Sequence, residues 1–551
     1  MKTNPATCYD GYKADHRRQY PVNSEMVFSN LTARGTRVEG VTKITFFGLQ
    51  YFIKRYLIEE WNNNFFGRPV EEVVKKYNRR LNNYLGPNQI GDQHLRDLHA
   101  LGYLPLEIWA LPEGSAVNLR VPMFVVYNTD PRFYWLTNAI ETILSVTLWL
   151  PCTSATTAII YRRILNEWAT KTNPEMLGFV PWQGHDFSFR GHSSYESAMT
   201  SGAAHLLAFT GTDTIPAIDF LEEYYNADSD KELVGGSVSA TEHSVMCMGG
   251  LEDEVETFRR LIEDVYPTGI VSIVSDTWDF WNVINPDNGI VVQLKDKIMT
   301  RQGKVVIRPD SGDPVKIVTG INFTEVDSLD DDHLLGYAVL ENVVKHENKY
   351  YEIEAYDTGW TTKFHKKEIT ELEVKGAIQC LWEIYGGTTT TTGYKQLDEH
   401  IGLIYGDSIT IERAKQICER LEAKGFASTN LVYGIGSFTY QGAITKDAIV
   451  TRDTHGFAVK STYGEVMENG VTRGIEIFKD PKTDDGLKKS AKGLTAVYKT
   501  NDDFYGDGFH LVDQATWDDV RNCAFHQVFQ DGKITKEWTL AEIRTEVEKS
   551  F

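Results

Sequence analysis

The sequence is poor in positive charge, has no CxxC cysteine pair and contains no apolar run long enough to cross a membrane. Its formal net charge is −21, because 77 Asp and Glu residues outnumber 56 Lys and Arg residues. A surface of this sign opposes binding to nucleic acids and to anionic membranes, since both need cationic groups that displace counterions. We therefore expect neither kind of partner, and any local basic cluster becomes informative.

The other absences concern compartment and cofactor. Six scattered cysteines favour reduced thiols over a disulfide framework or a zinc site. The stretch MKTNPATCYDGYK lacks the apolar core of a secretory signal. The longest apolar stretch, residues 139–151, contains Glu141 and reads as a buried helix. No GxGxxG turn follows an N-terminal strand, which argues against an NAD-dependent dehydrogenase. We expect a cytoplasmic protein.

A recurring pattern begins near residue 178, where short apolar runs end in Gly, Asp, Arg or Ser and are followed by helical stretches. Continuous apolar runs are typical of buried parallel strands, and the helices between them supply crossovers. The pattern predicts an α/β fold with an irregular (β/α) barrel-like domain over residues 151–437, and reactive groups at the strand ends. The instances are FVPWQGHDFSFRG, LAFTGTDT, GGSVSATEHS, GIVSIVSDTWD, KVVIRPDSGDP, IGLIYGDS and TNLVYGIGS.

Segments outside this pattern predict further units. Residues 1–150 and 438–551 contain hairpin-like stretches such as FAVKSTYGEVMENGVTRGIEIFKDP, so we assign them to a second α+β domain built from both termini. Residues 314–372 interrupt the barrel pattern with KHENKYYEIEAYDTGWTTKFHKKEIT, which alternates like a charged antiparallel hairpin and predicts an inserted surface subdomain. Five threonines at 388–392 between glycines predict a loop, with phosphate binding as the less favoured interpretation.

Three of the strand ends carry groups suited to an anionic ligand and a flat ring. In RPDSGDP, Arg308 offers a planar fork for phosphate or carboxylate, and Asp310 can hold a hydroxyl or a metal-bound water. The alternative is a surface turn with a chance ion pair. In GHDFSFRG, Phe187 next to Arg190 suits a heteroaromatic ring, although a phenylalanine there is more often core.

Two strand ends that carry glycine, and a basic tract, are further candidates for binding phosphate. IYGDS and YGIGS would let a phosphate approach the backbone closely. Near the C-terminus, basic residues gather in an otherwise acidic chain. A solvated face is the default interpretation, but a polyphosphate ligand would need such a cluster. The tract consists of Arg452, Lys460, Lys479, Lys488, Lys489 and Lys492.

With these residues, the sequence closely resembles the nicotinamide phosphoribosyltransferase family of type II phosphoribosyltransferases. The motifs appear in family order over nearly the whole chain except residues 314–372. They are YDGYKADHRRQYP, FFGLQYFI, NTDPRFYWLTNAIETIL, HDFSFRG, GTDT, EHS, SDTWD, IRPDSGDP, IYGDS and FKDP. Some relatives have GDG where this chain has GDS, and GSGGG where it has GIGSF, which weakens inference about single backbone contacts.

The resemblance implies roles for named residues. Nicotinamide would lie between Phe187 and Tyr12 of a second subunit in a homodimer with shared sites. Asp213 would accept a hydrogen bond from the carboxamide, and Arg308 and Arg190 would lie near the amide oxygen and the phosphate-bearing product. Asp310 would face ribose, and Asp276 of SDTWD is a further candidate catalytic carboxylate. The 5′-phosphate would be held by Gly406, Asp407, Gly434 and Gly436.

The remaining implied roles concern phosphate and energy. His243 of EHS corresponds to a family histidine linked to ATP-dependent activation through phosphorylation; the alternative is a hydrogen-bonding residue beside pyrophosphate. Phosphoribosyl pyrophosphate (PRPP) would bind to a set of basic residues together with Mg²⁺. The sequence shows no metal cage made of protein ligands alone, so the ion would come with the pyrophosphate. These basic residues are Arg452, Lys460, Lys479 and Lys488.

The implied reaction joins nicotinamide to PRPP and releases pyrophosphate, in NAD salvage. One alternative is a nicotinate phosphoribosyltransferase, and another is a noncatalytic relative that binds NAD precursors. Asp213 favours the amide, because a carboxylate attracts an NH₂ group and repels the carboxylate of nicotinate.

Overall fold

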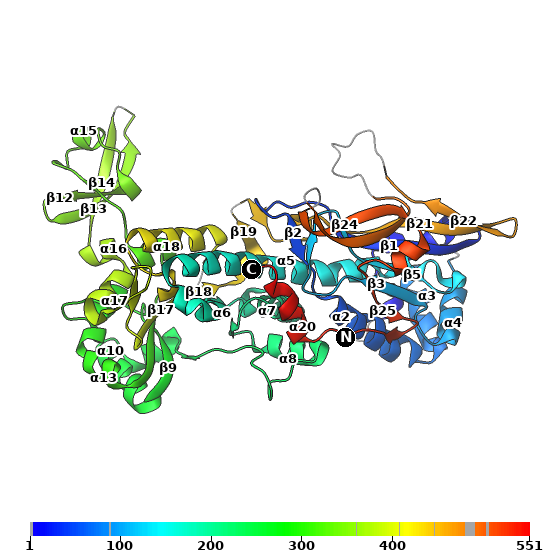
Figure 1. Ribbon diagram of the computed structural model, residues 1–551, viewed down its shortest axis with the longest axis horizontal. Coiled ribbons are helices and arrows are strands. Elements are labelled where there is room, and N and C mark those ends of the chain that lie inside the picture. Colours follow the sequence, from blue (N-terminus) through cyan, green and yellow to red (C-terminus); the bar gives the residue numbers. More distant parts are fainter. Residues whose placement is uncertain are drawn as a thin grey trace.

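Two seven-stranded sheets organise the chain, and the long helix α5 (Leu136–Thr172) runs between them (Figure 1). The computed structural model describes residues 4–87, 90–359, 361–406, 408–445, 447–479, 491–502 and 506–551. Helix α5 is long and apolar enough to cross a membrane, but 72 % of its most apolar window is buried inside the structure. It is a core helix, as predicted from the apolar stretch at 139–151, but the prediction that no apolar segment is long enough to cross a membrane was wrong, because the helix extends well beyond that stretch. The domain boundary expected at residue 150 falls inside it.

The first sheet is parallel throughout and has the order β7-β6-β18-β17-β10-β9-β8. Each predicted apolar run supplies one of its strands, so the strand predictions are confirmed. In the FVPWQG run the strand is shorter than expected, because Pro181 starts helix α6 (Val180–Gln183). The strands are β6 (Gly184–Asp186), β7 (Gly211–Thr212), β8 (Ser239–Ala240), β9 (Thr268–Val274), β10 (Gln302–Arg308), β17 (Ile401–Tyr405) and β18 (Leu431–Ile435).

One short segment joins the two edges of this sheet. Gly236 forms a parallel bridge with Gly211 of β7, and the Thr212 N–H donates to the Gly236 carbonyl at 2.9 Å. Three residues further along, β8 pairs with β9. Residues 236–240 therefore close the parallel strands into a ring.

The second sheet is antiparallel and combines both ends of the chain, in the order β22-β21-β1-β5-β3-β25-β26. Its central contact pairs β1 with β21 and places Asn30 opposite Lys460. The hairpin predicted from FAVKSTYGEVMENG is β21 followed by β22 and is confirmed. The strands are β1 (Ser24–Ala33), β3 (Leu106–Ala110), β5 (Pro122–Asn128), β21 (Phe457–Glu468), β22 (Val471–Glu476), β25 (His526–Gln530) and β26 (Lys533–Ile534).

The insertion forms a small sheet of its own, which projects from the barrel end of the molecule (Figure 1). Its strands are β11 (Thr324–Glu325), β12 (Val343–His346), β13 (Lys349–Asp357) and β14 (Thr362–Ile369). Strands β13 and β14 pair antiparallel, which confirms the predicted hairpin. Val344 and Ile353 belong to a core that is separate from the main one. An ion pair between Glu341 and Arg420 of helix α18 (Ile411–Ala423) ties the insertion to the barrel.

The threonine run differs from the prediction of a loop. Its start belongs to β15 (Gly387–Thr389), which pairs with β16 (Lys395–Leu397) in a hairpin. The hydroxyls of Thr390 and Thr392 both donate to the Thr172 carbonyl at the end of α5, at 2.9 and 2.8 Å. These hydroxyls satisfy a helix carbonyl that has no intrahelical partner, which gives the run a structural role.

Candidate active site

The predicted site residues of the barrel gather at one edge of the parallel sheet. Parallel strands end at the same edge, so groups that follow different strands meet there. Phe187 follows β6, Asp213 follows β7, Arg308 ends β10 and Gly406 follows β17. A cavity of about 360 Å³ runs inside the ring of strands, from the beginnings of β17 and β18 to this edge, where Phe187, Asp213 and Arg308 line it.

A buried aspartate fixes the two loops that carry the ring-binding and amide-binding candidates. Asp186 ends β6 and is fully buried. Its Oδ1 accepts from the N–H and the hydroxyl of Ser188, at 2.9 and 2.6 Å, and its Oδ2 accepts from the Thr214 hydroxyl at 2.7 Å. Because Phe187 and Asp213 are the neighbours of these residues in sequence, the backbone at both is held in place.

Phe187 is half-buried and lies beside an aromatic neighbour. Its N–H donates to the Ile435 carbonyl at 3.0 Å, which continues the pairing of β6 with β18. The rings of His185 and Phe187 are 4.5 Å apart at 39°. Phe187 lines the cavity and leaves room for a flat ligand on the open side.

Asp213 presents an ionised carboxylate to the cavity. Its Oδ1 accepts from His185 Nε2 at 2.9 Å and from the Ser237 hydroxyl at 2.8 Å. Burial disfavours the charged form, but the hydrogen bonds from His185 and Ser237 and the charge of Arg308 outweigh it and lower the pKa of Asp213. Both hydrogen bonds fall on one oxygen, which leaves Oδ2 as the acceptor for a ligand.

Arg308 contributes the positive charge of the same cavity. One terminal nitrogen donates to the Thr241 carbonyl at 2.8 Å, and its Nε is buried without an acceptor among the described residues. A buried donor without a partner is a candidate contact for a bound ligand. Arg190 lies in the exposed turn η7 (Phe189–Gly191) near the same loop and does not line the cavity.

Carboxylates and a histidine form the second part of the site, after β8, β9 and β10. Asp276 Oδ2 accepts from the N–H of Asp310 and from the N–H and hydroxyl of Ser311, at 2.9, 2.8 and 2.6 Å. His243, the first residue of α9 (His243–Gly249), places Nε2 3.8 Å from Asp276 Oδ1 and 4.0 Å from Asp310 Oδ2. The structure thus brings together the three predicted catalytic residues, His243, Asp276 and Asp310.

The two glycine ends lie side by side, as predicted. Tyr405 pairs with Tyr433 in parallel register, so Gly406 and Gly434 occupy corresponding positions. A Cβ atom at Gly406 would lie 2.1 Å from Asp310 Oδ1, and one at Gly434 would lie 2.5 Å from the Tyr405 carbonyl oxygen. A side chain at Gly434 would collide with backbone, and one at Gly406 would displace the Asp310 carboxylate. Gly436 follows β18 and accepts from the N–H groups of Thr439 and Tyr440; the predicted Asp407 lies outside the described residues.

The predicted basic residues lie in the terminal region. Burial lowers the pKa of Lys460, and the positive charges of Arg34, Lys13 and Arg452 act in the same direction, against the charge of Glu141, which is paired with Lys13 at 2.8 Å. Such like-charge crowding marks a place for an anion. Lys479 is exposed, and Lys488 lies outside the described residues. Tyr12 is 67 % exposed, beside His16, with 5.3 Å between ring centres.

Three residues near these sites were not predicted from the sequence. His185 and Ser237 hold the Asp213 carboxylate, and Arg34 joins the basic cluster. His185 lies inside the GHDFSFRG motif, so its position in the sequence could have indicated a role in the site. Ser237 and Arg34 gave none, because their partners are distant in sequence.

Two family models and one solved structure show to which class of protein the chain belongs. The model of the nicotinate phosphoribosyltransferase (NAPRTase) family matches residues 182–533, and that of the nicotinamide phosphoribosyltransferase N-terminal domain matches residues 4–108. A nicotinate-nucleotide pyrophosphorylase from Pyrococcus furiosus shares the fold, with a TM-score of 0.51 and 12 % identity over 99 % of this chain and 95 % of that chain. The chain therefore has a phosphoribosyltransferase fold.

Full-length relatives then define the family. A nicotinamide phosphoribosyltransferase of Acinetobacter baylyi is 48 % identical over 99 % of this chain and 97 % of its own length. One of Xanthomonas campestris is 30 % identical over 97 % and 96 %, and one of Mycoplasma pneumoniae is 32 % identical over 86 % and 92 %. The chain belongs to the nicotinamide phosphoribosyltransferase family.

Proposed function

We propose that this enzyme transfers the phosphoribosyl group of PRPP to nicotinamide and releases nicotinamide mononucleotide and pyrophosphate, in NAD salvage. The observation that carries the choice of base is Asp213, a carboxylate with a lowered pKa and one free oxygen at the cavity wall. A negative group there attracts the amide NH₂ of nicotinamide and repels the carboxylate of nicotinate.

The reaction is a displacement at the anomeric carbon of PRPP. The pyridine nitrogen of nicotinamide supplies the electron pair for the new C–N bond, and the C–O bond to pyrophosphate breaks with its electron pair leaving on oxygen. No covalent intermediate with the enzyme is needed, so the protein acts through positioning and electrostatics. Phe187 orients the ring, Asp213 and Arg308 hold the amide, and Asp310 faces the ribose.

The residues beside His243 fit the Mg²⁺ that accompanies pyrophosphate. Asp276 Oδ1 is buried and has no hydrogen-bond partner among the described residues, and the Asp310 carboxylate lies on the same side of His243. Mg²⁺ is commonly held by one or two carboxylates together with substrate phosphates. No group of three or more His, Cys, Asp or Glu in the described chain forms a cage. When bound, the ion neutralises charge on the pyrophosphate.

We also propose a homodimer with shared active sites. Tyr12 is exposed, does not line the cavity and interacts with Arg452 of the terminal region. A second copy would bring Tyr12 and the basic cluster to the open side of Phe187, which gives the base its second stacking face and PRPP its cations.

Mixing two inactive variants tests the sharing. Tyr12→Ala and Asp213→Asn remove groups that come from different subunits in this arrangement. After random exchange about half of the dimers are mixed, and each has one intact site, so about a quarter of wild-type turnover returns. Unshared sites would give no recovery.

For His243 we propose an ATP-linked role in which the imidazole accepts a phosphoryl group. Its side chain is 47 % exposed, so an imidazole nitrogen can attack the terminal phosphate of ATP, with ADP as the leaving group. His243→Ala should remove the stimulation by ATP and leave ATP-independent turnover measurable. Equal stimulation in wild type and variant would exclude phosphorylation at this residue.

A product assay tests the reaction itself. PRPP and Mg²⁺ are supplied with nicotinamide or nicotinate, with and without ATP, and mononucleotide and pyrophosphate are quantified. We expect both products with nicotinamide and far less with nicotinate. Preference for nicotinate would show that the enzyme is a nicotinate phosphoribosyltransferase. Absence of pyrophosphate with either base would indicate a noncatalytic binding protein.

A further inference from the structure

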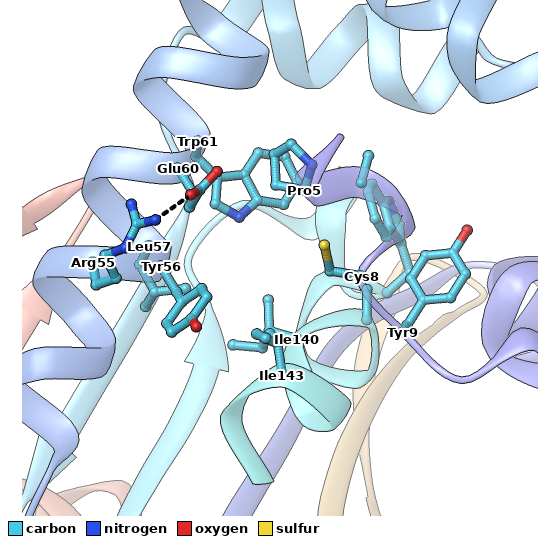
Figure 2. A pocket seen from close by; sticks show the side chains of 13 residues that line it. Pro5, Cys8, Tyr9, Arg55, Tyr56, Leu57, Glu60, Trp61, Ile140 and Ile143 are labelled. Carbon is cyan, nitrogen blue, oxygen red and sulfur yellow. Dashed lines mark ion pairs between the residues drawn. The ribbon is translucent and has the colours of Figure 1, made fainter. Parts of the chain in front are cut away.

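A second cavity lies in the terminal region, apart from the barrel site (Figure 2). Its volume is about 210 Å³. Aromatic and aliphatic side chains make up most of the wall, and no residue of the parallel sheet lines it. The wall includes Tyr9, Tyr56, Trp61, Trp135, Ile140 and Ile143.

The cavity is built on an unusual helix. Residues Ile53–Glu60 and Asn62–Phe66 have π-helical hydrogen bonding. Arg55, Tyr56 and Trp61, from this stretch, surround the cavity in Figure 2. π-Helical turns are rare and occur frequently at functional sites. The π-helical wall is thus a second sign, independent of volume, that the cavity has a use.

The volume sets the size of a possible occupant. An apolar cavity of about 150 Å³ in a protein core binds benzene, so this larger one accommodates a benzene-sized ring with one small substituent. Ring walls from Tyr56, Trp61 and Trp135 favour an aromatic occupant, since offset and edge-to-face contacts between rings are stabilising.

The polar groups of the cavity wall determine which chemical class of occupant fits. Arg55 is paired with Glu60 at 2.8 Å and with Glu59 at 3.3 Å, so a charged occupant would have to break an existing ion pair. Trp135 is 8 % exposed and its indole nitrogen is fully buried, so this residue offers an occupant the side of its ring and no hydrogen-bond donor.

We propose that this cavity binds a small uncharged aromatic molecule, at a site separate from the barrel. The occupant would touch Tyr56, whose hydroxyl donates to Glu196 Oε1 at 2.6 Å. Glu196 lies on α7 (Tyr195–His205), the helix that follows the loop carrying Phe187. The ligand would therefore contact a side chain that joins the terminal region to the barrel.

Protection of Cys8 tests the proposal with acetophenone as the probe. Cys8 is half-buried, and its sulfur faces the interior of the cavity (Figure 2). Alkylation is followed peptide by peptide, with Cys523 as the internal reference and saturating nicotinamide mononucleotide in the barrel site, since its phosphate charge keeps it out of this cavity. At about four times the Kd, alkylation of Cys8 should slow about five-fold, and Cys523 should not change.

Two variants assign the protection to this cavity. Ala139→Leu adds volume from the cavity wall on α5 and should abolish protection of Cys8. Trp135→Phe replaces the indole with a smaller ring, which reduces the aromatic contact with the probe, and should weaken its binding about three- to ten-fold. A thermal unfolding transition like that of wild type shows that each variant is folded, and Trp135→Phe retains the test if Ala139→Leu does not fold. No protection in wild type, or undiminished protection in both variants, would overturn the proposal.

Discussion

His185 Nε2 lies 2.9 Å from Asp213 Oδ1, and the same imidazole lies against the ring of Phe187, with 4.5 Å between ring centres. One side chain therefore contacts both groups that we assign to the base. It donates to the carboxylate that selects the amide and supports the ring that stacks on the pyridine. Ser237 donates to the same Asp213 oxygen from the segment that closes the ring of strands.

Removing this imidazole should reduce the use of nicotinamide. We expect His185→Ala to lower kcat/KM for nicotinamide about 10- to 100-fold, since a hydrogen bond to a charged group contributes roughly 1.5–3 kcal/mol. His185→Gln places an amide N–H near the position of Nε2 and should recover part of the loss. Steady-state kinetics on both variants provide the check. Equal losses would show that the ring, and not its hydrogen bond, matters.

Asp213→Asn tests the choice between the two bases. The neutral amide no longer repels the carboxylate of nicotinate and is a poorer acceptor for the NH₂ of nicotinamide. We expect kcat/KM for nicotinamide to fall by about 10- to 100-fold and kcat/KM for nicotinate to change far less. Parallel turnover assays with both bases measure this. Equal losses would contradict the assignment of Asp213 to the amide.

The selectivity between the bases should not depend on pH from about 5 to 8. An ordinary aspartate has a pKa of about 3.9, and the pKa of Asp213 is lowered from there. The charged form therefore persists throughout this range and is lost only in stronger acid. The ratio of kcat/KM for nicotinamide to that for nicotinate, measured at several pH values, should stay constant. A steep fall of this kcat/KM ratio between pH 7 and pH 5 would mean that the pKa of Asp213 is raised.

Gly406→Ala should impair PRPP use through Asp310. The new methyl group would lie 2.1 Å from Asp310 Oδ1, so the carboxylate must move. A displacement of about 1 Å in an active site can lower turnover about 100-fold. Gly178→Ala is a matched control, because nothing lies within 4 Å of its Cβ position. Kinetics with varied PRPP compare the two. Similar activity in both variants would argue against a role for the Asp310 position.

Much of the barrel was predictable because buried parallel strands leave a readable signal. KVVI before Arg308 and IGLIY before Gly406 are uninterrupted apolar runs, and the groups after them fall at one sheet edge by the geometry of parallel strands. The closing segment was predicted as a strand from GGSVSATEHS, but its extent and its bridge to β7 were not. Gly236 makes a single bridge and β8 has two residues, too short for any periodicity.

Contacts between distant residues set the other limit. Arg34 and Lys460 approach because β1 pairs with β21, across more than 400 positions of sequence. The sequence marked Lys460 as part of a basic tract but held no sign of its partner. The threonine run was predicted as a loop for a related reason. Its hydroxyls donate to the end of α5, which is distant in the sequence.

Residues 236–240 carry a consequence for how the active enzyme is assembled. The same few residues join β7 to β9, bring Ser237 to Asp213 and lead into the helix that starts with His243. The pairings of this segment span 25 positions to Gly211 and 32 positions to Val271, whereas β18 pairs with β6 across 249 positions, and long-range pairings are slow to form. The segment can therefore place Ser237 and His243 before the ring of strands is complete. Catalytic competence would then await the pairing of β18 with β6, which anchors the Phe187 N–H on the Ile435 carbonyl.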